Sequence, residues 1–172
     1  MKTLDDVFNE FSEQLQEYLP WLENCFGIVK SVKRDGHEEP VLLSHKNEYV
    51  SVFPDTRLGN YSFFDIESTQ TFVSWNKGRA PILKVPFSLI LWYDLSNIEG
   101  HERSVEQIKR EVSTAMWQKI TLRLSSFRLT GISTDANRIF GKFYRTGMET
   151  KYLMHPYGAM KFSGNVYFSE RD

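Results

Sequence analysis

Apolar residues at the start of the chain recur at the spacing of an α-helix. They fall on one side of a helix that would span residues 3–19, and the other side carries carboxylates. Thr3 can cap this helix, Asp6 lies near the positive end of its dipole, and Pro20 ends it. The apolar stripe consists of Leu4, Phe8, Phe11, Leu15 and Leu19.

After this helix, short alternating or apolar runs are separated by turn residues, which is the pattern of β-strands. Asp35 and Gly36 predict a tight hairpin turn between two of these runs. Residues 84–95 form the strongest strand, and their nearly continuous apolar character predicts that both faces are covered. The other predicted strands lie within residues 27–34, 37–43, 48–53, 61–68 and 69–75, with a turn at 76–81.

A second helix is predicted from Ser104, which forms a capping-box sequence with Gln107. We expect it to run to about residue 125, although residues 120–124 also alternate and could form a strand. Residues 130–151 are poorly patterned, and the chain closes with a strand that places Phe162, Val166 and Phe168 on one face. The helix positions expected to pack on the sheet are Val105, Ile108, Val112, Ala115 and Met116.

These elements predict an α+β fold formed by residues 1–172 as a single domain. Its sheet should be mostly antiparallel, because short turns join most of the strands. The N-terminal helix and the helix near residues 104–125 should pack against this sheet.

Composition narrows the possible classes of protein. The 172 residues carry a net charge of −1, whereas a general nucleic-acid-binding protein would be clearly basic, so nucleic acid is disfavoured as a partner. The start of the chain has no signal-peptide pattern, and no apolar run approaches the ~20 residues of a membrane helix. The single cysteine, Cys25, suits a reducing compartment and is expected to be a small buried apolar residue. We therefore expect a soluble protein of the cytoplasm.

No motif of a known catalytic, nucleotide-binding or metal-binding class is present, and we expect no cofactor and no metal. The most suggestive polar groups are Asp65 and Glu67, which would point to the same side of a strand and could support acid–base chemistry. Lys77 and Arg79 lie in a turn whose backbone could hold a phosphate. Exposed strand and turn positions are the alternative interpretation of both pairs. Core packing is expected for Trp75, Trp92 and Trp117.

Charge is distributed unevenly along the chain, which is near neutral as a whole. The first 24 residues are strongly acidic, and their carboxylates include Glu10, Glu13 and Glu17. Residues 119–161 are basic, and their cations include Arg138, Lys142 and Arg145. Solvated surfaces would explain this arrangement, but so would self-association through surfaces of opposite charge.

The order of elements resembles that of phage and prophage tail-terminator, tail-completion or neck proteins. The resemblance lies in an amphipathic N-terminal helix, then antiparallel strands, a second helix, and a turn containing proline that leads into a final strand. The corresponding segments are LDDVFNEFSEQL, EYVSVF through VPFSLILWYDL, SVEQIKREVSTAM and HPYGAMKFSGNVYF.

This resemblance implies a non-enzymatic structural protein of virion assembly, which forms a ring that caps the tail tube. Its partners would be further copies of itself, tail-tube proteins and head–tail connector proteins, without a membrane. It would be found in the cytoplasm of a bacterial host, or in the virion. Apolar contacts in such a ring could come from exposed aromatic residues and from the loops near Arg57 and Arg79. The alternative is a small enzyme or ligand-binding domain with its site near Asp65, Glu67, Lys77 and Arg79.

Overall fold

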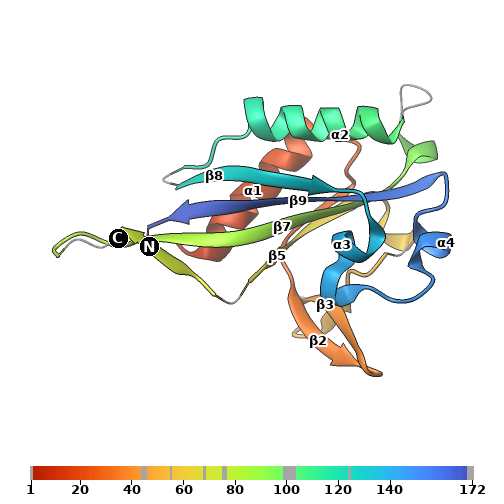
Figure 1. The fold of residues 1–172 in the computed structure, drawn as a ribbon, viewed down its shortest axis with the longest axis horizontal. Coiled ribbons are helices and arrows are strands. Elements are labelled where there is room, and N and C mark those ends of the chain that lie inside the picture. The colour runs from red at the N-terminus through yellow and green to blue at the C-terminus, as the bar shows by residue number, and fades with distance from the viewer. Residues whose placement is uncertain are drawn as a thin grey trace.

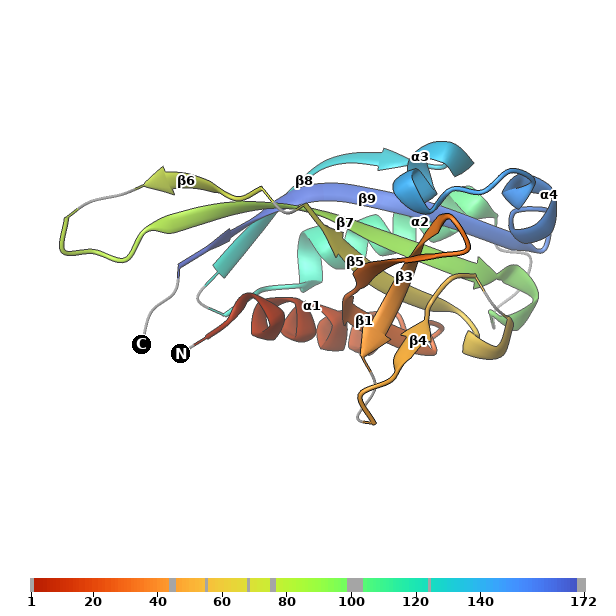
Figure 2. The same cartoon turned by 90° about the horizontal axis from the view of Figure 1, so that it is seen from below.

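The computed structural model describes residues 2–43, 46–54, 56–67, 69–74, 77–98, 104–123 and 125–169. A mixed sheet lies between helices on its two faces, as Figures 1 and 2 show. The fold is α+β and the sheet is mostly antiparallel, as the sequence predicts. His45, Trp75 and His101 lie outside the described residues.

The N-terminal helix α1 (Leu4–Tyr18) has the boundaries that its capping residues predict. The hydroxyl of Thr3 accepts a hydrogen bond from the backbone N–H of Asp6, and the Asp6 carboxylate accepts one from the backbone N–H of Thr3. This reciprocal pair satisfies two donors that the first helical turn would otherwise leave open. Phe8, Phe11 and Leu15 are fully buried, so the predicted stripe is the packing face.

The long strand β7 (Ile82–Asp94) forms the centre of the sheet and pairs over most of its length with β9 (Tyr157–Phe168). On its other side lie β5 (Tyr61–Ile66) and β6 (Thr71–Ser74). β1 (Asn24–Ile28) runs parallel to β5, and β8 (Ser125–Ser133) runs antiparallel to β9. The sheet order is therefore β1-β5-β7-β9-β8, with β6 continuing the β5 side of β7.

A second, smaller sheet contains β2 (Lys30–Arg34), β3 (His37–Leu43) and β4 (Tyr49–Ser51). Its tight turn falls at Asp35 and Gly36, whose φ angles of 50° and 78° are the left-handed values that a type I′ hairpin requires. The predicted hairpin is thereby confirmed. The loop after β4 includes the short 3₁₀ turn η1 (Thr56–Leu58).

The second helix, α2 (Val105–Thr114), begins with the predicted capping box of Ser104 and Gln107. It continues as the π-helical turn η3 (Ala115–Lys119), so it ends at Lys119 rather than near residue 125. The described residues after it, 120–123, form neither the predicted helical extension nor a strand.

Two packing predictions for this helix are wrong. Val105 is 41% exposed because it lies in the first turn, before the helix crosses the sheet. Trp117 is 78% exposed because it follows Ile108 by nine residues, which at about 100° per residue is the opposite side of the helix. Ile108, Val112, Ala115 and Met116 are buried as predicted. Trp92 is buried, also as predicted.

The poorly patterned region 130–151 is more ordered than its sequence indicates. It contains the end of β8, the helix α3 (Ala136–Phe140), the 3₁₀ turn η4 (Gly141–Phe143) and the helix α4 (Met148–Tyr152). These short helices lie on the face of the sheet opposite to α1 and α2 (Figure 2). A further 3₁₀ turn, η2 (Leu95–Asn97), follows β7.

Each face of the sheet has its own core. Strand positions Leu89, Leu91 and Phe162 pack with α1 and α2 on one face. On the other face, Ile90 and Trp92 pack with α3, η4, α4 and the region of the small sheet. This second core covers only one half of its face and leaves the other half open. Among the described residues, no helix has the length and apolar character needed to cross a membrane.

Candidate functional site

A polar hollow of about 890 Å³ opens on the half of the sheet that α3 and α4 leave uncovered. Its floor is formed by side chains that alternate with the buried core positions of β5, β7 and β9. Strand register places Asp65 opposite Ser88, and Ser88 opposite Ser163. One carboxyl group and two hydroxyl groups therefore form a row across three strands.

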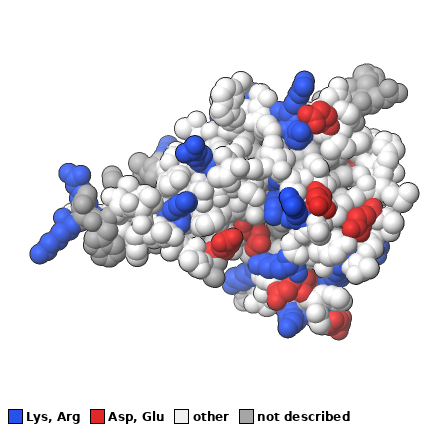
Figure 3. All heavy atoms as spheres, in the orientation of Figure 1, with Lys and Arg blue, Asp and Glu red and all other residues white. Residues whose placement is uncertain are grey.

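Two lysines contribute positive charge to this hollow. Lys142 of η4 lies 3.2 Å from the Asp65 carboxylate, measured from Nζ to Oδ1, and the half-buried Lys161 projects from β9. Burial raises the pKa of Asp65 above its ordinary value, and the charges of Lys142 and Lys161 partly oppose this rise. Figure 3 shows this face, with acidic and basic side chains side by side near its centre. The arrangement can hold a ligand that carries charges of both signs.

The sequence identifies only part of this hollow. Asp65 and Glu67 both line it, as their spacing predicts. Lys77 and Arg79 do not line it, because they lie in the turn at the far end of the β6–β7 hairpin. Lys142 and Lys161 provide its cations instead. The alternation of Lys161, Ser163 and Asn165 along the last strand is the sequence signal that could have revealed Lys161, whereas no local signal points to Lys142.

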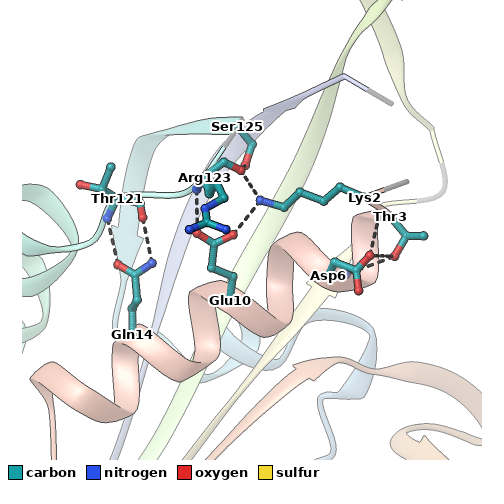
Figure 4. A network of polar contacts seen from close by, with 8 residues as sticks. All are labelled: Lys2, Thr3, Asp6, Glu10, Gln14, Thr121, Arg123 and Ser125. Carbon is teal, nitrogen blue, oxygen red and sulfur yellow. Dashed lines mark hydrogen bonds and ion pairs between the residues drawn. The ribbon is translucent and has the colours of Figure 1, made fainter. Parts of the chain in front are cut away.

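The acidic residues predicted to form an interface differ in their surroundings. Glu10 is engaged within the chain, because its carboxylate lies 2.7 Å from the Lys2 ammonium and accepts a hydrogen bond of 2.6 Å from the backbone N–H of Arg123 (Figure 4). Glu13 and Glu17 are exposed on the outer side of α1. The segment after α2 is thus hydrogen-bonded to α1.

The predicted basic residues differ in the same way. Lys142 pairs with Asp65, and the Arg145 guanidinium lies 4.3 Å from the centre of the Phe53 ring. Arg138 is exposed on α3, and Arg57 is exposed in η1. The structure does not gather Arg138, Lys142 and Arg145 into one open basic surface. It does place α1 and α3 on opposite faces of the sheet.

We call β6, the described turn residues 77–81 and the start of β7 the arm, because this hairpin projects at one end of the sheet (Figures 1 and 2). Phe72 is 55% exposed and Val73 is 54% exposed on its strand β6. Lys77 and Arg79 are exposed near its tip. The arm therefore combines apolar side chains with a cationic end.

The opposite edge of the sheet carries a second exposed apolar area. No described strand pairs with the outer edge of β8. Beside this strand, between it and η3, lies a groove of about 400 Å³, which we call the edge groove. Sequence reasoning missed this area, because β8 was not predicted and Trp117 was expected in the core. The edge groove is lined by Met116, Trp117, Ile120, Phe127, Arg128 and Leu129.

The described residues contain neither a cluster of metal ligands nor an activated cysteine. In the described part of the chain, no group of three or more His, Cys, Asp or Glu residues could hold a metal ion. Burial raises the pKa of the Cys25 thiol to about 11, so this cysteine is not an activated nucleophile.

No protein-family model matches the chain, and no characterised protein matches its sequence.

Proposed function

We propose that this chain is a non-enzymatic assembly protein of a phage or prophage tail, of the tail-terminator or tail-completion kind. In this role, copies associate head to tail into a ring that caps the tail tube. The proposal combines the order of elements with the surfaces described above. A head-to-tail contact joins two different surfaces of the same chain, as a ring requires.

The arm is the observation that carries this proposal. Phe72 and Val73 are more than half exposed on this hairpin, so a neighbouring molecule can remove further apolar area from water there. Among the described strands, none pairs with the outer edge of β6, so another strand can add to it there. The edge groove provides a second apolar area on the other edge of the sheet, and the two surfaces are unlike each other.

The charge distribution also supports a head-to-tail contact, but fewer charged residues are exposed for it than the sequence suggests. Glu13 and Glu17 on one face and Arg138 on the other are exposed and available to another molecule. Glu10, Lys142 and Arg145 already have partners within the chain. Exposed ion pairs contribute about 0–1 kcal/mol each, so they orient a contact whose affinity comes from apolar surface.

The test is the oligomeric state of the purified chain, measured by sedimentation velocity and negative-stain electron microscopy over a range of concentrations. Because a tail tube can act as a template, the same measurement is repeated in the presence of purified phage tail tubes. We expect closed rings or ring-capped tubes. A chain that stays monomeric and leaves tubes uncapped would contradict the proposal.

A charge test separates orientation from folding. Reversing Glu13 and Glu17 together, or Arg138 alone, should weaken assembly and leave the melting temperature unchanged. Reversing Lys142 or Arg145 should instead lower the melting temperature, because their partners Asp65 and Phe53 lie within the same chain. Equal assembly by all of these variants would leave the charges with no role in association.

The polar hollow supports a second candidate function, which is the binding of a small zwitterionic ligand. Asp65, which pairs with Lys142, and the half-buried Lys161 place carboxyl and ammonium groups within one hollow. Isothermal titration with free amino acids and short peptides tests this function. Binding that is lost in Lys161→Met and retained in Lys77→Met would support it, and no heat with any of these probes would exclude it for this class.

A further inference from the structure

We infer that the arm of one copy adds to the free edge of β8 in the next copy and places Phe72 in the edge groove. This inference rests on the proposed function and specifies the contact that holds the ring together. The resulting interface would extend the sheet from one subunit into the next. Five features of the described residues support it.

The first feature is the pair of open edges. β8 and β6 lie on opposite sides of the sheet, and no described strand pairs with the outer edge of either. An open edge presents backbone N–H and C=O groups that accept another strand, and natural edges are commonly blocked by proline or by charged residues. β8 contains no proline, and its one charged residue is Arg128.

The second feature is strand direction. β6 is antiparallel to β7, β7 to β9, and β9 to β8, so β6 and β8 run in opposite directions within one sheet. A second copy in the same orientation therefore brings its β6 antiparallel to β8. This geometry joins unlike edges, so the contact can repeat from copy to copy around a ring.

The third feature is the side to which Phe72 points. Phe72 lies opposite Leu83 in the β6–β7 ladder, and directly opposed residues share one face of a sheet. Leu83 alternates with Val85 and Phe87, of which Phe87 packs in the core beneath α1 and α2. On β8, Phe127 and Leu129 pack against that same core. Phe72 of a neighbouring copy would thus lie on the face where the edge groove opens.

The fourth feature is complementary apolar surface. Trp117 stands beside the groove at 78% exposure, and Phe72 on the arm is 55% exposed. Burying two such rings against each other removes a large apolar area from water, and aromatic anchors of this kind dominate interface energetics. The groove of about 400 Å³ has room for one phenyl ring.

The fifth feature is charge. In the antiparallel arrangement, the arm continues past the start of β8 toward the first turn of α1. That turn carries Asp5 and Asp6, and Figure 4 shows Asp6 and Glu10 on the helix that lies beside Arg123 and Ser125. Lys77 and Arg79 near the arm tip would therefore approach an acidic helix end. The apolar and charged parts of the two surfaces match in the same order.

The experiment compares two variants that break opposite sides of the contact, Phe72→Asp and Trp117→Asp. Both side chains are more than half exposed, and the melting temperature of each variant is measured together with its association, so that weaker folding is distinguished from a weaker contact. Each alone should associate at least about tenfold more weakly than the parent, which corresponds to about 1.4 kcal/mol. The matched control is Val105→Asp, an exposed apolar residue at the other end of α2, which should assemble like the parent. Phe72→Ala and Trp117→Ala repeat the test without an added charge.

Mixing the two aspartate variants identifies the kind of contact. Phe72→Asp keeps an intact groove and Trp117→Asp keeps an intact arm, so native mass spectrometry of the mixture should detect heterodimers and no longer chains. A parent that assembles while both variants assemble equally well would overturn this contact and leave the proposed function in place. Absence of heterodimers from the mixture would also overturn it. A parent that never assembles, with or without tail tubes, would overturn the proposed function and this contact together.

Discussion

The side-chain amide of Gln14 forms a reciprocal pair of hydrogen bonds with the backbone of Thr121 (Figure 4). Its Nε2 donates to the Thr121 carbonyl at 2.8 Å, and its Oε1 accepts from the Thr121 N–H at 3.0 Å. One side chain of α1 thereby satisfies both polar groups of a residue in the irregular segment after α2. The two helices are joined through this segment as well as through their shared core.

Replacing Gln14 with alanine removes both bonds and should lower the free energy of unfolding by about 1–2 kcal/mol, since each bond contributes about 1 kcal/mol. Urea unfolding measures the change. The control is Glu13→Ala, an exposed neighbour on the same helix, which should change stability by less than about 0.5 kcal/mol. If the two variants unfold at the same urea concentration, the reciprocal pair does not stabilise the fold.

Replacing Ile108 with aspartate should destabilise the protein by several kcal/mol, because this fully buried position offers a carboxylate no partner. The same substitution at Val105, which is 41% exposed, should have a small effect. Thermal unfolding followed by circular dichroism distinguishes the two. An unchanged melting temperature for the Ile108 variant would mean that this face of α2 does not pack on the sheet.

Gly164 permits the close approach of β9 to β8. A Cβ atom at this position would lie 2.4 Å from the backbone oxygen of Arg128, and backbone atoms cannot move aside as a flexible side chain can. Gly164→Ala should therefore cost about 1–3 kcal/mol. Gly131→Ala is the matched control, because no atom lies within 4 Å of its added Cβ. Similar chemical denaturation curves for both variants would contradict the tight register of these strands.

The raised pKa of Asp65 predicts a dependence of stability on pH. Because burial favours the neutral acid in the folded state, the folded chain binds more protons than the unfolded chain between the ordinary aspartate pKa of about 4 and the raised value. Stability should fall as pH rises through this interval. The decline should be absent in Asp65→Asn and steeper in Lys142→Met, which removes the cation 3.2 Å away. Unfolding free energies measured between about pH 3 and 7 test both statements, and a decline that persists in Asp65→Asn would assign it to another group.

Local signals explain what could be predicted from the sequence. Thr3 and Ser104 start helices through side-chain caps that involve residues only three positions away, and Phe162, Val166 and Phe168 alternate along one strand. β8 escaped prediction because a register shift between Leu129 and Gly131 interrupts its alternation, and because glycine ordinarily breaks strands. The sequence does not reveal β8 because its apolar alternation is interrupted, and the strand becomes evident only from its pairing with β9.

In the candidate site, too, residues close in sequence could be predicted and contacts between distant segments could not. Asp65 and Glu67 could be paired from their spacing, since alternate residues of a strand share a face. Lys142 could not be matched to Asp65, because the contact depends on how η4 folds back over the sheet. Trp117 was expected in the core as a large apolar residue beside Ala115 and Met116, although its spacing of nine residues from the buried Ile108 already places it on the opposite side of the helix.

The π-turn has a consequence for how this sequence can change in length. The N–H of Ile120 bonds to the carbonyl of Ala115, five residues earlier, so this turn holds one residue more than an α-helix needs. That extra residue lets Lys119 remain in solvent while Ile120 is buried. A deletion of one residue at Gln118 would convert the turn to ordinary α-helical geometry and keep Ile120 in the core. A related chain that is one residue shorter here would therefore keep the same buried face of the sheet.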